Sequence, residues 1–158
     1  MNDAPATLFV YGTLKQGQLN CPLLDPYARA VEPAWTQGVL YDFGLYPGLV
    51  AGAGIVHGEL VQLDPATLTE ALALLDRLEG YQPDDLPGSI YRREVVTVET
   101  AHGTQVRAYT YFYNHDPAGL PRVADGAWFA PPAATATATD SAFDQHVRTF
   151  LRRAANQQ

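Results

Sequence analysis

Short apolar runs separated by turn-forming residues predict that this chain is built mainly from strands. The runs at residues 7–11, 34–41 and 55–63 have the length and alternation of strands. Residues 12–32 are rich in loop-forming residues and have room for a short helical turn. Residues 42–50 combine two glycines and a proline with apolar residues, which favours a fixed loop over a pocket.

The clearest strand pair covers residues 91–99 and 105–114, joined by a hairpin turn near residue 102. In the second strand, Tyr109, Tyr111 and Tyr113 alternate with other residues and therefore share one face. The opposite face carries Val106, Ala108, Thr110 and Phe112. One face has to be core, and the tyrosine face either packs as well or forms the wall of a pocket.

One helix is predicted over residues 65–79. Asp64 followed by Pro65 is typical of an N-cap and a first helical position, and Gly80 is typical of the residue just after a helix. Apolar residues recur at helical spacing and form one stripe, namely Leu68, Ala71, Leu72, Leu75 and Leu78. This stripe is expected to face the core.

Glu79 continues the apolar stripe at the C-terminal end of this helix. At about 100° per residue it lies roughly 20° from Leu68 around the helix axis, whereas Arg77 lies on the opposite side. Burial and the helix dipole both disfavour a negative charge there, so we expect a pKa raised toward the range of a general acid or base. The alternative is a structural role, in which a buried Glu79 pairs with Arg92 or Arg93.

A second candidate feature, Tyr11, Gly12, Thr13 and Leu14, follows the first strand directly. The glycine interrupts the strand, so the backbone N–H groups here are released from the sheet and can point at a ligand. We call residues 11–14 the Tyr11 loop. Together with Glu79 it forms the candidate site of the chain.

Length and composition indicate one compact domain. The chain has 158 residues, of which 47% are hydrophobic and 17% are charged. Its net charge of −7 argues against nucleic acid or an anionic membrane surface as a partner, because both select basic patches. No apolar run is long enough to span a bilayer, and the N-terminus lacks the basic start of a signal peptide.

The metal-ligating and nucleophilic residue types point to no further site. Cys21 is the only cysteine, which rules out an intramolecular disulfide and favours a reducing, cytoplasmic location. It has no histidine near it in sequence, so a nucleophilic role lacks support. The four histidines stand far apart without metal-ligand spacing, and we expect no metal.

The composition changes after Asn114. Residues 115–139 are rich in Pro, Ala and Thr and are expected to form a linker or surface strap. Residues 140–155 have the cap and apolar stripe of a C-terminal helix. The irregular order of several strands and one or two helices predicts a mixed α/β (α+β) class, with a small closed or barrel-like sheet and flanking helices.

Ordered motifs along the chain resemble the gamma-glutamylcyclotransferase superfamily, in its AIG2-like branch. They span about residues 8–113. The two most specific are the Tyr11 loop and the Glu79-Gly80-Tyr81 sequence that ends the helix. Between and after them come Tyr46-Pro47-Gly48-Leu49, Gly58-Glu59-Leu60, Leu75-Asp76 and Tyr91-Arg92-Arg93.

The resemblance implies a cyclisation reaction. In the family, the α-amine of a γ-glutamyl group attacks its own side-chain carbonyl, which forms 5-oxoproline and expels an amine or amino acid. The catalytic glutamate of the family corresponds to Glu79, and its ligand-holding loop to Tyr11, Gly12, Thr13 and Leu14. The leaving-group pocket is expected to include Tyr46 and Tyr113, and the reaction needs no metal or cofactor.

Two other interpretations remain open at this point. A non-catalytic module could use the same pocket to bind a small metabolite or a side chain of a partner protein. A related lyase or amide-cleaving enzyme could remove a γ-glutamyl protecting group within a biosynthetic pathway. The sequence does not select the γ-glutamyl compound, and it leaves the oligomeric state undetermined.

Overall fold

The structure is a computed structural model that describes residues 5–129. The predicted C-terminal helix at residues 140–155 and the Ala/Thr-rich part of the predicted strap lie outside the described residues. Among the described residues, no helix has both the length and the apolar character needed to cross a membrane.

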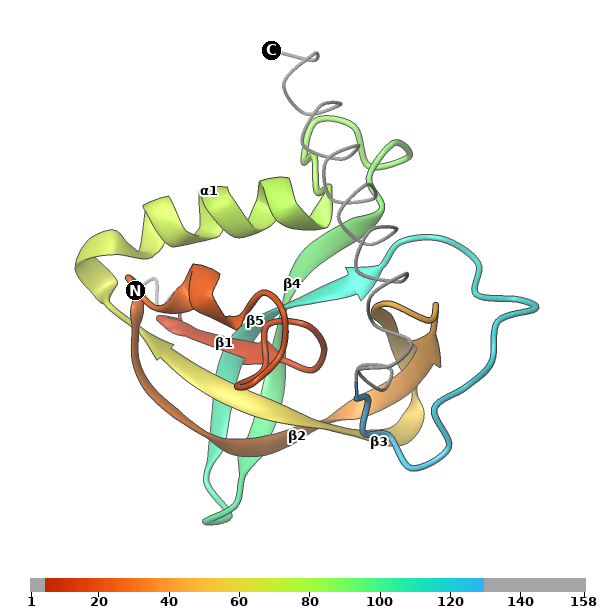
Figure 1. The fold of residues 1–158 in the computed structure, drawn as a ribbon, viewed down its shortest axis with the longest axis horizontal. Helices are drawn as coiled ribbons and strands as arrows, with labels where there is room; N and C mark the ends of the chain where they lie inside the picture. Colours follow the sequence, from red (N-terminus) through yellow and green to blue (C-terminus); the bar gives the residue numbers. More distant parts are fainter. Residues whose placement is uncertain (1–4, 130–158) are drawn as a thin grey trace.

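Five strands close into a small barrel (Figure 1). They are β1 (Thr7–Val10), β2 (Ala28–Asp42), β3 (Pro47–Leu63), β4 (Tyr91–Thr100) and β5 (Gln105–Tyr113). Their order is β1-β3-β2-β4-β5, and a parallel contact between Leu8 of β1 and Tyr109 of β5 closes the barrel. The predicted mixed class with a barrel-like sheet is therefore confirmed.

β2 and β3 are longer than the apolar pattern predicts. β2 begins at Ala28 and not near residue 34, and β3 begins at Pro47, inside the segment expected to be a loop. Antiparallel pairing continues to Asp42 and Pro47, so the connecting turn is short. The pairing shifts register between Gln37 and Val39, where residues 51–54 are exposed. Cross-strand hydrogen bonding here outweighs the weak strand preference of glycine and proline.

The helical segments follow the predicted limits closely. A 3-10 turn, η2 (Pro65–Thr67), precedes α1 (Leu68–Glu79), and the Asp64 side chain caps it by accepting from the Ala66 N–H at 3.0 Å. Gly80 ends α1 in the left-handed conformation, with φ of 67°. The short turn expected between the first two strands is η1 (Cys21–Leu24).

The apolar side chains of the barrel and α1 form two clusters. One fills the barrel interior and includes Ala108 and Phe112 of β5. The other lies between the outside of the barrel and α1, and it includes Tyr111, with Tyr109 and Tyr113 packed against it. The predicted division of β5 into two faces is confirmed, and its tyrosine face is the one that meets α1.

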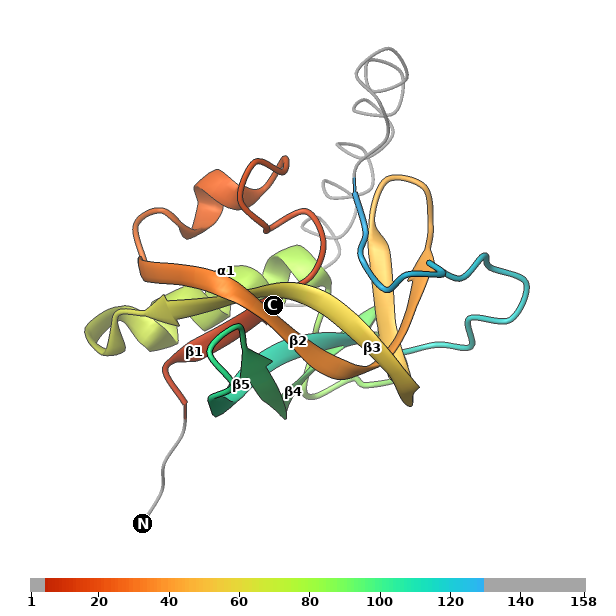
Figure 2. The ribbon, with the colours of Figure 1, turned by 90° about the horizontal axis from the view of Figure 1, so that it is seen from below.

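After β5, the chain returns along the outside of β2 and β3 (Figure 2). The Val123 N–H donates to Leu40 O at 2.8 Å, and the His57 N–H donates to Gly126 O at 2.8 Å. Trp128 is buried in the interior cluster. These contacts hold residues 121–128 against the barrel.

Candidate active site

Just after β1, the backbone of Gly12 lies so close to the ring of Pro47 that there is no room for a side chain. A Cβ atom on Gly12 would lie 2.7 Å from both Cδ and Cγ of Pro47. The carbonyl of Gly12 accepts from the Lys15 N–H at 3.1 Å, and that of Thr13 accepts from the Asn20 N–H at 2.8 Å. These bonds turn the loop toward the C-terminal end of α1, as the shared pocket below shows.

Three consecutive N–H groups of this loop remain free to bind a ligand. Within residues 5–129, the N–H groups of Gly12, Thr13 and Leu14 donate to no protein acceptor. Gly12 and Leu14 are buried, where an unpaired donor costs about 1–3 kcal/mol. A group of adjacent N–H donors of this kind suits a carboxylate or an oxyanion.

The Tyr11 loop and Glu79 line the same pocket. The pocket encloses about 590 Å³, part of which is open to solvent. Its wall combines aliphatic side chains with aromatic ones, namely Phe9 and tyrosines 11, 46, 91 and 111. Among the described residues, no lysine, arginine or histidine lines it, and Glu79 is its acidic residue.

The Glu79 carboxyl has a strongly raised pKa. Burial is the larger cause and the nearby Asp76 carboxylate the smaller, and together they raise the pKa of Glu79 from 4.5 to about 8. Among the described residues, no ion pair joins Glu79 to a cation. Arg93 pairs with Asp76 at 2.5 Å, and Arg92 pairs with Glu94. The alternative structural role, in which Glu79 pairs with Arg92 or Arg93, is therefore not observed.

Three tyrosines of the wall give their hydroxyl protons to protein acceptors. Tyr11 Oη donates to Tyr111 O at 2.6 Å, and Tyr91 Oη donates to Pro47 O at 2.7 Å. Tyr111 Oη donates to Asp76 Oδ1 at 2.6 Å. Burial raises the pKa of each of the three hydroxyls, so all remain protonated near neutral pH.

The structure places Tyr46, but not Tyr113, in the pocket wall. Burial raises the pKa of Tyr46 to about 12. The ring of Tyr113 lies outside the wall and packs on Phe43 and Tyr91, with centroid distances of 4.8 and 5.8 Å. Tyr113 therefore packs beside the pocket wall in this structure, and its role in substrate binding stays a prediction.

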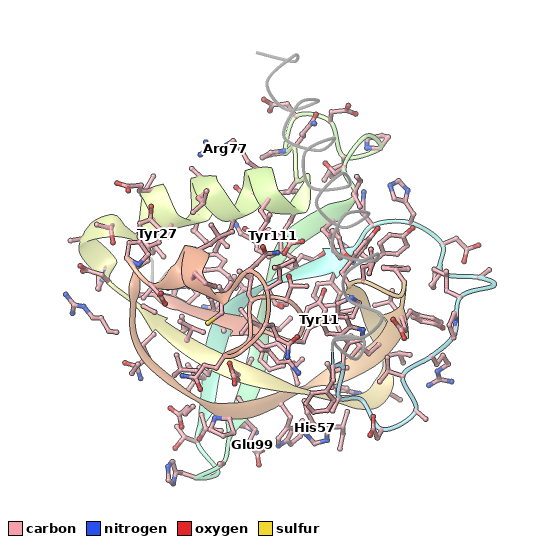
Figure 3. All side chains as sticks on the ribbon, viewed as in Figure 1. Tyr11, Tyr27, His57, Arg77, Glu99 and Tyr111 are labelled. Carbon is pink, nitrogen blue, oxygen red and sulfur yellow. The ribbon has the colours of Figure 1, made fainter. Side chains whose placement is uncertain are left out.

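Tyr111 takes the place in the wall that the sequence analysis gave to Tyr113. Figure 3 shows Tyr111 beneath α1, whereas Arg77 projects from the outer side of the helix. Asn20, Tyr91 and Asp76 were not singled out from the sequence as parts of this site. For Asp76 a signal existed, because a residue three positions before Glu79 shares its side of the helix.

The described residues offer no obvious metal site. Within residues 5–129, no group of three or more His, Cys, Asp or Glu side chains is arranged to hold a metal ion. The polar groups that converge on the pocket are instead one carboxyl, several hydroxyls and the N–H donors of the Tyr11 loop. This combination can accept and return a proton, and it can stabilise a negative charge on a ligand.

Comparison with known proteins identifies the family. Residues 8–130 match the family described as gamma-glutamyl cyclotransferase, AIG2-like. A putative gamma-glutamylcyclotransferase from Vibrio cholerae is 41% identical over 112 residues, which cover 67% of this chain and 80% of the relative. The gamma-L-glutamyl-butirosin B gamma-glutamyl cyclotransferase of Niallia circulans is 33% identical over 110 residues, covering 69% of this chain and 67% of the relative.

Solved structures agree on the fold. The crystal structure of an AIG2-like protein from Mus musculus superposes with a TM-score of 0.60 at 21% identity, covering 84% of this chain and 93% of the mouse protein. The family match spans the whole barrel, α1, the Tyr11 loop and Glu79. The chain therefore belongs to the gamma-glutamyl cyclotransferase, AIG2-like family.

Proposed function

We propose that this protein is a γ-glutamyl cyclotransferase that converts a small γ-glutamyl amine or γ-glutamyl amino acid into 5-oxoproline and the free amine or amino acid. Family membership supports the reaction class. The Niallia circulans relative is named for a γ-glutamyl group attached to butirosin B, which supports an amide-linked γ-glutamyl substrate.

The observation that carries the proposal is the position of Glu79. Its carboxyl has a pKa of about 8 and lines the same pocket as the free N–H groups of the Tyr11 loop. A group with such a pKa can both accept and donate a proton near neutral pH. The N–H donors can hold the substrate carboxylate or the oxyanion that forms on the attacked carbonyl.

The proposed reaction is intramolecular and consumes no water. Ionised Glu79 takes one proton from the α-ammonium of the γ-glutamyl group, and the resulting amine attacks the γ-carbonyl carbon. The carbonyl oxygen becomes negatively charged in the tetrahedral intermediate, which N–H groups of the Tyr11 loop stabilise. Glu79 gives its proton to the leaving nitrogen and, ionised again, takes the second proton from the ring nitrogen. The bond to the leaving nitrogen then breaks as the carbonyl re-forms, and Glu79 passes the second proton to the released amine. Closure of a five-membered ring gains much of its rate from orientation.

The pocket must recognise the γ-glutamyl carboxylate without a basic side chain. Among the described residues, its wall contains no lysine or arginine. Neutral donors at this wall include the N–H groups of the Tyr11 loop and the Asn20 side-chain amide, of which one N–H already donates to Thr13 Oγ1 at 3.0 Å. Backbone donors of this type bind anions well when they are buried and converge.

The test is 5-oxoproline release from a panel of γ-glutamyl amines, γ-glutamyl amino acids and γ-glutamyl-lysine. The parent protein is compared with Glu79→Gln and with Glu70→Gln, an exposed position on the same helix. We expect product from the parent and from Glu70→Gln, and a loss of at least about 100-fold with Glu79→Gln. Full turnover by Glu79→Gln would refute the role of Glu79. Equal ligand binding by parent and Glu79→Gln without product from either would favour a binding module.

A further inference from the structure

Asp76 lies one turn before Glu79 on α1, and two short hydrogen bonds connect it to β4 and β5. Its Oδ1 atom accepts from Tyr111 Oη of β5 at 2.6 Å, and its Oδ2 atom accepts from Arg93 Nη1 of β4 at 2.5 Å. The side chains of Asp76 and Arg93 are only 19% and 24% exposed. No step of the proposed reaction uses these three residues, although Tyr111 lines the pocket beside Glu79.

The contact with Asp76 determines what Tyr111 can offer to a ligand. A tyrosine hydroxyl has one proton to donate and two lone pairs that accept. The proton of Tyr111 is already directed at a carboxylate, and burial together with Asp76 raises the pKa of Tyr111, which keeps the proton in place. In any further contact, Tyr111 Oη can therefore only accept a hydrogen bond, and the Arg93 guanidinium also interacts with this hydroxyl.

The other two buried hydroxyls of the wall are weaker acceptors. Tyr11 Oη already accepts from the Leu49 N–H at 3.3 Å, so part of its acceptor capacity is taken. Tyr91 Oη gives its proton to a neutral backbone carbonyl, Pro47 O. Tyr111 Oη donates to the side chain of Asp76, which pairs with Arg93, and hydrogen bonds to such charged groups are about twice as strong as those to neutral groups and polarise the donor oxygen more.

We propose that Asp76 is a positioning residue, which by accepting the Tyr111 hydroxyl proton turns Tyr111 Oη into the acceptor for the α-ammonium of the γ-glutamyl substrate. The inference rests on the proposed function for the identity of that substrate. Arg93 pairs with Asp76 and holds its carboxylate in place. Tyr111 and Glu79 then form an acceptor side for the ammonium, and the Tyr11 loop forms a donor side for the carboxylate.

The proposal is tested by binding in the Glu79→Gln background, where turnover does not interfere. Isothermal titration calorimetry compares two probes, γ-L-glutamyl ethylamide and glutaric acid monoethylamide, which keeps the carboxylate and the amide but lacks the α-amine. Tyr111→Phe is expected to weaken binding of the amine-bearing probe roughly tenfold and to leave the other probe unchanged. Tyr109→Phe, on the same face of β5 but outside the pocket wall, is the matched control and should change neither.

The action of Asp76 through Tyr111 is tested by a double-mutant cycle. Asp76→Asn alone should weaken binding of the amine-bearing probe several-fold, because an amide oxygen is a weaker acceptor for the Tyr111 proton. In combination with Tyr111→Phe it should cause no further loss, because its effect passes through the missing hydroxyl. A structural defect would instead weaken both probes and add to the effect of Tyr111→Phe.

The outcomes separate this inference from the proposed function. An equal loss of both probes in Tyr111→Phe, or no loss of either, would overturn it, and so would additive losses in the cycle. Failure of the amine-bearing probe to bind more tightly than the other probe before Tyr111 is changed would overturn it as well. Absence of 5-oxoproline from the parent protein, with the amine-specific losses intact, would refute the cyclisation and keep the ammonium site.

Discussion

Asp76 and Glu79 lie one helical turn apart at the end of α1, and of these two acids only Asp76 pairs with a cation among the described residues. Arg93 pairs with Asp76, whereas Glu79 lines the pocket, where burial and, to a smaller extent, the nearby Asp76 carboxylate raise its pKa. Two carboxyl groups on one helix are thereby placed in different electrostatic surroundings. This separation is typical of sites in which one acid moves a proton and the other holds a charge.

The first prediction concerns the pH dependence of the reaction. Because Glu79 must be ionised to act as a base, kcat/KM should rise about tenfold per pH unit on the acid side and level off near pH 8. Asp76→Asn removes a negative charge that raises the pKa of Glu79, so this acid limb should move to lower pH. Initial rates from pH 5 to 9 for parent and variant measure this shift. An acid limb at the same pH in both proteins would contradict the effect of Asp76 on the pKa of Glu79.

A second prediction links Glu79 to stability. The pKa of Glu79 is raised from 4.5 to about 8 on folding, so its ionisation opposes folding progressively as pH rises through this interval. The Glu79→Gln variant cannot ionise, and it should gain a few kcal/mol of unfolding free energy relative to the parent between pH 5 and pH 9. Urea unfolding of parent and variant at pH 5 and at pH 9 measures this change. If the difference in unfolding free energy is the same at both pH values, the raised pKa of Glu79 is contradicted.

The third prediction concerns the close contact between Gly12 and Pro47. Gly12→Ala should destabilise the protein by about 1–3 kcal/mol and lower kcat/KM, because the new Cβ would lie 2.7 Å from the proline ring and push the Tyr11 loop away. Pro47→Ala removes both ring atoms, so the double variant should recover part of the loss. Thermal unfolding and turnover of the two single variants and the double variant measure this recovery. No recovery in the double variant would show that the contact is not the cause.

A fourth prediction concerns the attachment of residues 121–128 to the Tyr11 loop region. Lys15 is buried, with Nζ donating to Trp128 O at 2.5 Å, and burial lowers the pKa of its ammonium. Lys15→Met should leave this carbonyl without its donor and cost about 1–3 kcal/mol of stability. In a Trp35→Phe background, the emission of Trp128 should shift to the red as its surroundings open to water. Unchanged emission and stability would mean that this bond does not hold the segment in place.

The limits of α1 and the orientation of Glu79 could be predicted from the sequence because they depend on neighbouring residues. Capping by Asp64, the left-handed Gly80 and the spacing of the apolar stripe all act within a few residues. The division of β5 into a tyrosine face and an interior face is local as well, since side chains alternate along a strand. These features, and the order of motifs typical of the family, were readable along the chain.

Which distant residues contact one another around Glu79 depends on closure of the barrel, and no local sequence pattern predicts that closure. Tyr111 meets Asp76 across 35 residues and Arg93 meets it across 17, so only the packing of α1 on β4 and β5 decides that Tyr111 lines the pocket and Tyr113 does not. The length of β2 and β3 likewise follows from pairing between strands, against the preference of the glycines and the proline within them. The sequence by itself therefore determined the acid and its helix, and the tertiary structure decided which groups surround it, because contacts between distant segments exist only once the sheet has closed.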